Sequence, residues 1–160
     1  MSGFIIFALP VSDGILAIAP MPGHGGYYTA DLAHLRDWKP AIVLSLVTQT
    51  ELVAHGAADL GSDIQDSGAR WIHLPVEDMD IPGHHQMEIW HAARKAALAA
   101  LRGGGRVLIH CLAGCGRSGA AALRLMIEAG EAPDRALARL RGVRACAVET
   151  QAQLNWACRP

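Results

Sequence analysis

The pattern of apolar and polar positions along the chain predicts short buried strands separated by helices. Continuous apolar runs, without the alternation of a half-exposed strand, are typical of strands covered on both faces. Such runs lie at residues 41–46, 71–76 and 106–110. Two more runs, at residues 4–8 and 15–18, are separated by Pro10 and turn-forming residues and predict an N-terminal hairpin.

Helical patterns fill the intervals between these runs. The clearest is residues 84–101, where apolar side chains recur every three or four positions. A shorter helix is expected at residues 29–37, with Thr29 as its N-cap and Pro40 as its stop. The remaining helices are expected at residues 48–55, 57–67, 117–129, 133–142 and 149–157. This alternation predicts an α/β fold, with a mostly parallel sheet of four or five strands flanked by helices.

Composition narrows the class of protein. The chain has 160 residues and lacks a linker-like stretch, so residues 1–160 are expected to form one domain. Hydrophobic residues make up 51% and charged residues 18%, which argues against disorder, and the net charge of -1 gives no general field for nucleic acid. The chain lacks a membrane-length apolar run, a basic leader and a dense cysteine framework. A reduced, cytoplasmic protein with no nucleic-acid or membrane partner is therefore expected.

The segment after the run at 106–110 carries the strongest chemical signal. It reads HCLAGCGRSG, from His110 to Gly119. In a parallel sheet, ligands bind at the carboxyl ends of the strands, which is where this loop lies. Gly114 and Gly116 allow a tightly curved loop whose amides turn inward around an anion, and Arg117 offers a planar fork for two oxygens. The expected oxyanion-binding residues are Leu112, Ala113, Gly114, Cys115, Gly116 and Arg117.

Cys111 opens this loop and is the candidate nucleophile. Inward amides and a guanidinium favour its thiolate form, and Ser118 is placed to donate a hydrogen bond to the sulfur. The alternative is that Cys111 is an ordinary buried cysteine beside two turn glycines. Two glycines together with histidine, arginine and serine at fixed places make a chance pattern remote. A phosphate ester, or another oxyanion, is the expected ligand.

The segment His110-Cys111-x5-Arg117-Ser118 resembles the signature of the cysteine-dependent protein tyrosine phosphatase superfamily, and most of all its small dual-specificity-type branch. The resemblance extends to an acidic segment before the 84–101 helix and to Glu149-Thr150-x-x-Gln153. It implies hydrolysis of phosphotyrosine, and also of phosphoserine or phosphothreonine, in a phosphorylated protein through a cysteinyl-phosphate intermediate. Metal and cofactor are not expected, because Arg117 and the amides supply the charge stabilisation.

Cleavage of a phosphate ester also needs a proton donor for the leaving oxygen. Glu77, Asp78 and Asp80 follow the run at 71–76 and would lie at the same sheet edge. The resemblance places the acid three residues after the proline that ends the strand, which selects Asp78; Asp80 is the second candidate. Gln153 either orients the hydrolytic water or is a solvated surface residue. His110 is expected to hold the loop through hydrogen bonds rather than to act as a base.

Other polar and thiol side chains have plainer interpretations. Cys115 either packs or forms a reversible disulfide with Cys111, with packing preferred. Cys146 and Cys158 are interpreted as buried structural thiols. His84 and His85 are interpreted as surface polar residues. Basic residues in and directly after the helix expected at residues 133–142 form a face that either meets an acidic substrate or is solvated. They are Arg135, Arg139, Arg141 and Arg144.

Several other functions remain as alternatives. Two of them are disfavoured: a zinc site on His110, Cys111 and Cys115 would lack a fourth ligand, and the Gly-x4-Gly-Lys-Ser/Thr pattern of a Walker-type nucleotide loop is missing. A rhodanese-like sulfurtransferase also uses a cysteine in an anion-binding loop, and a catalytically idle phosphoprotein-binding module would keep the same cradle. Leu112 and Cys115 stand where the resembling inositol-lipid phosphatases often carry lysines, so a phosphoprotein is preferred to a lipid headgroup.

Overall fold

The computed structural model describes residues 3–159, and its centre is one five-stranded sheet in the order β1-β2-β5-β3-β4. β1 runs antiparallel to β2, and every other neighbouring pair is parallel. This confirms the predicted α/β fold with a mostly parallel sheet. The strands are β1 (Phe7–Val11), β2 (Gly14–Ala19), β3 (Ile42–Ser45), β4 (Arg70–His73) and β5 (Arg106–His110).

The N-terminal hairpin lies later in the chain than the apolar runs indicate. β1 begins at Phe7 rather than at residue 4, and it includes Pro10, which pairs with Ile15. Proline lacks the N–H that an inner strand needs, but β1 is at the edge of the sheet, where that loss is tolerated. β4 is also shorter than expected and ends at His73, so residues 74–76 begin the connection to the next helix.

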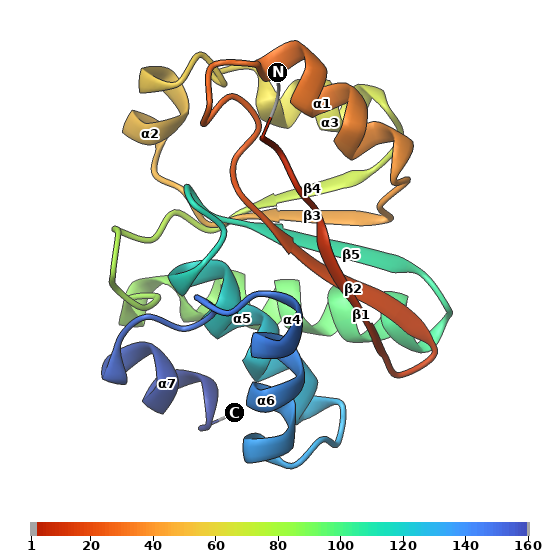
Figure 1. The fold of residues 1–160 in the computed structure, drawn as a ribbon, viewed down its shortest axis with the longest axis vertical. Coiled ribbons are helices and arrows are strands. Elements are labelled where there is room, and N and C mark those ends of the chain that lie inside the picture. The colour runs from red at the N-terminus through yellow and green to blue at the C-terminus, as the bar shows by residue number, and fades with distance from the viewer. Residues whose placement is uncertain (1–2, 160) are drawn as a thin grey trace.

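The helices form two layers, one on each face of the sheet (Figure 1). On one side lie α1 (Tyr28–Asp37), α2 (Gln49–Ala54) and α3 (Leu60–Asp66). On the other side lie α4 (Met87–Arg102), α5 (Gly116–Glu128), α6 (Pro133–Val143) and α7 (Gln151–Ala157), and the short 3-10 helix η1 (His84–Gln86) precedes α4. None of the helices in residues 3–159 is both long and apolar enough to cross a membrane.

Helix starts differ in how they are capped. Thr29 is not the N-cap of α1, because the helix already begins at Tyr28 and Tyr27 stands at the cap position. α2 and α7 begin with reciprocal capping boxes, formed by Thr48 with Glu51 and by Thr150 with Gln153. In each box a threonine hydroxyl accepts from a helix N–H while the partner side chain accepts from the threonine N–H. These two starts fix Glu51 and Gln153 near the carboxyl ends of the strands.

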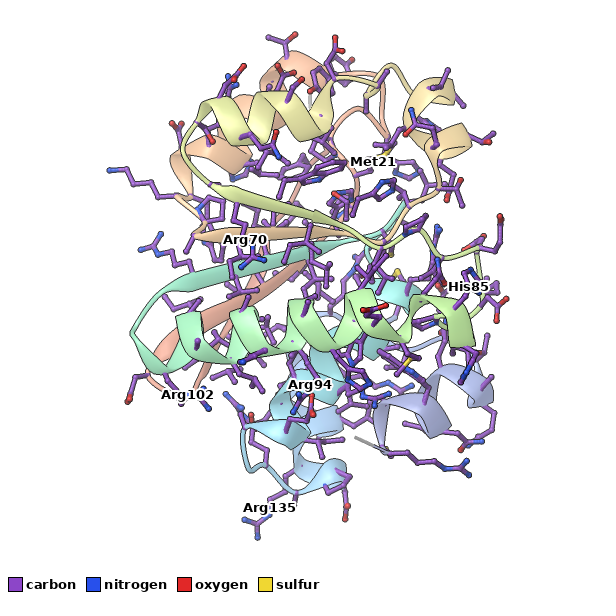
Figure 2. The ribbon with its side chains drawn as sticks, turned by 180° about the vertical axis from the view of Figure 1, so that it is seen from behind. Met21, Arg70, His85, Arg94, Arg102 and Arg135 are labelled. Carbon is purple, nitrogen blue, oxygen red and sulfur yellow. A yellow bond between two sulfur atoms is a disulfide. The ribbon has the colours of Figure 1, made fainter. Side chains whose placement is uncertain are left out.

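Each face of the sheet has its own apolar core. The helical repeat of α4 turns Trp90, Ala93, Ala97 and Leu101 onto the sheet, where all four are buried. Figure 2 views the molecule from behind and shows Arg94 and Arg102 along α4, with His85 near its start. The second core lies under α1 and α3 and is closed by residues such as Leu35, Leu60 and Ile64. Because β2, β5, β3 and β4 are parallel, the loops at their carboxyl ends meet at one edge of the sheet.

Candidate active site

Residues 111–115 connect β5 to α5, and together with Gly116, the first residue of α5, they are here called the β5–α5 loop. This loop turns its carbonyl groups outward. The Leu112 carbonyl accepts from Met21 N at 3.0 Å, and the Cys115 carbonyl accepts from Gly119 N at 3.0 Å and from Val148 N at 3.2 Å. Arg144 donates to the carbonyls of Ala113, at 2.9 Å, and Gly114, at 3.2 Å. In a trans peptide the next N–H points opposite to the C=O. The amides of residues 113–116 therefore face the inside of the loop.

Gly114 is required at the sharpest point of this curve. Its φ is +75°, in the left-handed region that side chains disfavour. A Cβ at this position would lie 2.6 Å from Ala19 C and 2.6 Å from Pro20 N, both backbone atoms that have little freedom to move. The loop therefore passes directly against the end of β2, and glycine is the residue that fits there.

A buried hydrogen-bond chain fixes the tautomer of His110. Trp71 Nε1 is only a donor, and it donates to Ser45 Oγ at 2.8 Å. The Cys111 carbonyl can only accept, so His110 Nδ1, 3.1 Å away, carries the ring proton and donates to it. Nε2 of the neutral ring is then the acceptor, and Ser45 Oγ donates to it. Burial lowers the pKa of His110 to about 4, so the ring is neutral around pH 7. His110 thus holds the first carbonyl of the loop outward and turns the Leu112 amide inward.

Cys111 directly follows β5, Arg117 lies in the first turn of α5, and both are buried, with 3% and 4% of their surface exposed. Cys111 Sγ is 3.2 Å from Ser118 Oγ, within hydrogen-bond distance for sulfur. The guanidinium of Arg117 is shielded from bulk solvent, and its Nη1 donates to the Val76 carbonyl at 2.7 Å. A cysteine sulfur, a hydroxyl and a guanidinium thus lie near one another at this loop.

Glu51 forms a two-point ion pair with the guanidinium of Arg117. Nη1 and Nη2 of Arg117 donate to Oε1 and Oε2 of Glu51 at 2.7 Å and 2.8 Å. The capping box adds the Thr48 N–H, which donates to Glu51 Oε1 at 2.9 Å. Burial alone would raise the pKa of Glu51, but the hydrogen bonds from Arg117 and Thr48 outweigh it and lower the pKa to about 2. Glu51 is therefore ionised at neutral pH and orients the arginine.

The three acidic candidates occupy the connection between β4 and η1, at the mouth of the site. Asp78 Oδ1 is 3.6 Å from Arg117 Nη2, and the side chain is 66% exposed. Asp78 and Asp80 each accept from the next backbone N–H, Asp78 from Met79 N at 3.0 Å and Asp80 from Ile81 N at 2.8 Å. Glu77 is exposed, and its carbonyl accepts from Asp80 N. Among the three, Asp78 is the carboxylate that has an ion pair with the arginine of the loop.

Gln153 is not a solvated surface residue, because it is fully buried in α7. Its Oε1 accepts from Glu149 N at 2.9 Å and Thr150 N at 3.1 Å, and its Nε2 donates to the Asp80 carbonyl at 3.4 Å. A Cβ on Gly116 would lie 2.9 Å from Gln153 Nε2. Gln153 therefore lies between the β5–α5 loop and the acidic segment.

The cysteines differ from expectation. Cys115 forms a disulfide with Cys146, which lies 31 residues away in sequence. Cys111 is free, so the suggested Cys111–Cys115 disulfide is absent. The preferred interpretation of Cys115 as a packed thiol, the interpretation of Cys146 as a structural thiol and the expectation of reduced cysteines are wrong, because these two residues are paired. Cys158 is free but exposed, which contradicts its assignment as a buried thiol. The spacing of the cysteines could not reveal the pair, because the fold alone brings the two segments together.

The basic face of α6 is only partly solvated. Arg135 points away from the molecule (Figure 2), as a solvated charge would. Arg139 instead pairs with Glu131 and donates to the Pro10 carbonyl at 2.6 Å. Arg141 donates to the Ala147 carbonyl at 2.9 Å, and Arg144 reaches the β5–α5 loop. Most of this charge run therefore binds backbone carbonyl groups.

Some residues of the site escaped the sequence reasoning. They are Ser45, Trp71, Glu51, Arg144 and Cys146. Among them, only Glu51 has a signal in the sequence: the Thr48-x-x-Glu51 pattern is typical of a helix start. That pattern does not predict the pairing of Glu51 with Arg117. Across residues 3–159 the structure holds no group of three or more histidine, cysteine and acidic side chains suited to a metal ion.

Comparisons with solved structures support the assignment of the fold. The kinase associated phosphatase, with its catalytic cysteine replaced by serine, is 21% identical, covering 98% of this chain and 93% of that chain at a TM-score of 0.85. Tk-PTP in its active form is 28% identical, covering 94% and 92% at a TM-score of 0.72. PTPMT1 in complex with PI(5)P is 17% identical, covering 94% and 92% at a TM-score of 0.75. No curated protein sequence matches this chain significantly.

A family model adds a match at the level of sequence. The model described as "Polymorphic toxin system, DSP-PTPase phosphatase" matches residues 21–131, which is more than half of the chain and includes the β5–α5 loop. This match agrees with the HCx5RS signature and with the fold of the solved phosphatases. The chain belongs to this family of DSP-PTPase phosphatases, within the cysteine-dependent protein tyrosine phosphatase superfamily.

Proposed function

We propose that the protein hydrolyses phosphate monoesters through a cysteinyl-phosphate intermediate, with residues 1–160 acting as one phosphatase domain. In the first step, the Cys111 thiolate forms a bond to phosphorus while the bond from phosphorus to the ester oxygen breaks. Asp78, in its protonated form, gives its proton to the leaving oxygen. The inward amides of the β5–α5 loop and Arg117 bind the phosphoryl oxygens, where negative charge accumulates.

In the second step, a water molecule attacks the phosphorus of the intermediate. Asp78, now a carboxylate, takes a proton from this water, and the sulfur–phosphorus bond breaks to release phosphate. The Ser118 hydroxyl, 3.2 Å from Cys111 Sγ, stabilises the departing thiolate by donating a hydrogen bond. Gln153 is proposed to orient the water, since it lies between the β5–α5 loop and the segment of Asp80.

One observation carries this proposal above the others. The carbonyls of the loop point outward onto Met21, Arg144 and Val148, so its amides converge on the side where Cys111 lies. Such a ring of N–H groups at the start of a helix is an anion site. A thiolate inside an anion site is useful for attack on phosphate. It would be unnecessary in a protein that only binds phosphoproteins.

The nucleophile is tested with para-nitrophenyl phosphate and the Cys111→Ser variant. Wild-type protein should release para-nitrophenol, and the variant should lose turnover while still binding inorganic phosphate. Release of para-nitrophenol by the variant at the wild-type rate would refute Cys111 as nucleophile. Inactive wild-type protein that binds phosphotyrosine peptides would instead support a binding module. Transfer of sulfur from thiosulfate to cyanide would support the sulfurtransferase, which the family match disfavours.

The acid is tested by the leaving-group dependence of matched variants. Asp78→Ala should reduce turnover of an alkyl phosphate about 10²–10⁴-fold, and that of para-nitrophenyl phosphate far less, because a good leaving group needs no proton. Asp80→Ala is the control. The proposal prefers Asp78 because its carboxylate is 3.6 Å from Arg117, beside the loop. The opposite ranking of the two variants would assign the acid to Asp80.

For the substrate class, we propose phosphotyrosine in proteins, with phosphoserine and phosphothreonine as further substrates. Within residues 111–117 the only charged side chain is Arg117, which suits a single phosphoryl group better than a multiply phosphorylated headgroup. A lipid substrate is the second candidate, because PTPMT1, of similar fold, was solved in complex with PI(5)P. Turnover of phosphotyrosine and phosphothreonine peptides is compared with that of PI(5)P. Preference for the lipid would refute the protein substrate.

A further inference from the structure

Residues 144–148, which follow α6, lie against the outer side of the β5–α5 loop (Figure 1). Val148 N donates to the Cys115 carbonyl at 3.2 Å. A Cβ on Gly119, in the first turn of α5, would lie 2.6 Å from Val148 N, so the backbones are in close contact. This segment contains neither the proposed nucleophile nor the proposed acid. It contacts the loop from the side opposite to the inward amides.

Arg144 makes the most specific contacts of this segment. Its Nη2 donates to the Ala113 carbonyl at 2.9 Å, and its Nε donates to the Gly114 carbonyl at 3.2 Å. The guanidinium also lies over the ring of Phe7 in β1, 4.3 Å from the ring centroid, a cation–π contact that adds to these hydrogen bonds. Two neighbouring carbonyls are thus fixed outward by one planar group. Lysine could not reproduce this, because it lacks the fork.

The Cys115–Cys146 disulfide ties the same two segments covalently. Cys115 lies in the middle of the anion-binding curve, four positions after the proposed nucleophile, and Cys146 lies two positions after Arg144. Arg144 Nη2 is 3.5 Å from Cys115 Sγ, so the guanidinium of Arg144 lies directly beside the disulfide. A covalent tie beside the hydrogen bonds keeps Arg144 near its two carbonyls.

We propose that residues 144–148 form an outer clamp on the phosphate-binding loop, that Arg144 is its positioning residue, and that the Cys115–Cys146 disulfide makes phosphate binding redox-sensitive. The proposal rests on the phosphate-binding role proposed above for the same loop. A dithiol reductant would transfer two electrons and two protons to the disulfide, giving two thiols and becoming a disulfide itself. The clamp then loses its covalent tie, the carbonyls of the loop turn more freely, and the inward amides lose their common direction.

The redox effect is measured in a Cys111→Ser/Cys158→Ser background, in which the only remaining cysteines are the disulfide pair. The dissociation constant for inorganic phosphate is determined by calorimetry for the oxidised protein and after reduction with dithiothreitol. Reduction should weaken binding about tenfold, the loss typical of one charge-assisted hydrogen bond. Adding Cys146→Ala should give the weak value under both conditions. Equal affinity of the oxidised and reduced forms would overturn the clamp, whereas absence of phosphate binding in both forms would overturn the proposed function as well.

Two variants of the oxidised protein separate the effect of the forked guanidinium of Arg144 from the effect of its positive charge. Arg144→Met should weaken phosphate binding about tenfold, and Arg144→Lys, which keeps the charge but not the fork, should recover only part of the loss. In protein with Cys111 intact, KM for para-nitrophenyl phosphate should rise more than kcat falls. A lower melting temperature with unchanged phosphate affinity in Arg144→Met would show a merely structural role and refute the assignment.

Discussion

The pairing of Glu51 with Arg117 leads to the most quantitative prediction. Glu51→Gln preserves the shape of the side chain and removes its charge. The guanidinium of Arg117 would then face one amide oxygen and one NH₂ group in place of two carboxylate oxygens, at positions now 2.7 Å and 2.8 Å away. One charge-assisted hydrogen bond is lost, and a donor is turned towards a donor. The variant should therefore be less stable than wild type.

The size of the effect follows from the pKa of Glu51. Burial opposes ionisation of this carboxyl, but Arg117 and Thr48 outweigh it, and the pKa falls from the ordinary 4.5 to about 2. The difference of about 2.5, at about 1.4 kcal/mol for each tenfold change in protonation, corresponds to about 3 kcal/mol at neutral pH. The side chains of Arg117 and Glu51 are 2% and 18% exposed, so solvent screens the pair only in part. Removing one partner of a buried pair costs about 3–5 kcal/mol, and the remaining acceptor of glutamine favours the lower end.

The assay is chemical and thermal unfolding of wild type, Glu51→Gln and the control Glu77→Gln, an exposed glutamate whose side chain faces solvent. A loss of about 3 kcal/mol in a chain of 160 residues lowers the melting temperature by about 6–12 °C. Glu77→Gln should stay within about 0.5 kcal/mol of wild type. Equal stability of Glu51→Gln and Glu77→Gln would refute the reasoning.

The pH dependence gives an independent check on the same pair. Because the pKa of Glu51 is lower in the folded than in the unfolded state, its contribution is fully present above about pH 4.5 and is lost as the pH falls towards 2. The difference in free energy of unfolding between wild type and Glu51→Gln should therefore be constant from pH 7 to 5 and smaller at pH 3.5. A difference that does not change at pH 3.5 would mean that the ionised carboxylate is not its source.

Three further predictions concern the surroundings of the loop. Burial lowers the pKa of His110 to about 4, so the folded protein resists protonation of this ring. The free energy of unfolding should therefore be constant above about pH 6.5 and fall by up to about 3 kcal/mol towards pH 4. Urea unfolding of His110→Asn should show a smaller pH dependence. Ser45→Ala leaves His110 and Trp71 without their shared hydroxyl and should cost about 2 kcal/mol in urea unfolding. Gly114→Ala forces a Cβ to within 2.6 Å of backbone atoms at a φ of +75° and should abolish phosphate binding measured by calorimetry, while Gly25→Ala, whose Cβ meets nothing within 4 Å, should leave it unchanged.

The sequence is most informative where the chemistry is local. His110, Cys111, Arg117 and Ser118 lie within nine consecutive residues between a strand and a helix, so the motif and its context can be recognised together. The order of strands and helices is predictable for a related reason, because strands covered on both faces are apolar throughout. The family match and the five-stranded sheet agree with both predictions.

The contacts that orient the motif are not local and were not predicted. Glu51 is 66 residues from Arg117, and Ser45 is 65 residues from His110. No spacing rule links such positions without the fold. The same reason explains the wrong interpretation of Cys146. Its partner Cys115 is 31 residues away, and the fold brings the segment after α6 against the β5–α5 loop. Pro10 shows the converse, because a residue that usually ends a strand is tolerated when that strand is at an edge.

The direction of the loop amides is consequently a property of the whole fold rather than of the HCx5RS motif. The carbonyls are held by Met21 after β2, by the His110 ring, and by Arg144 and Val148 after α6. Each contact fixes a peptide plane, and a ring of N–H groups binds an anion most tightly when its N–H groups point to a common centre. Chains that keep the motif but lose these outer contacts should bind phosphate weakly despite an intact cysteine and arginine. Substitutions outside the motif, above all at Arg144, therefore test the origin of anion binding more directly than substitutions within it.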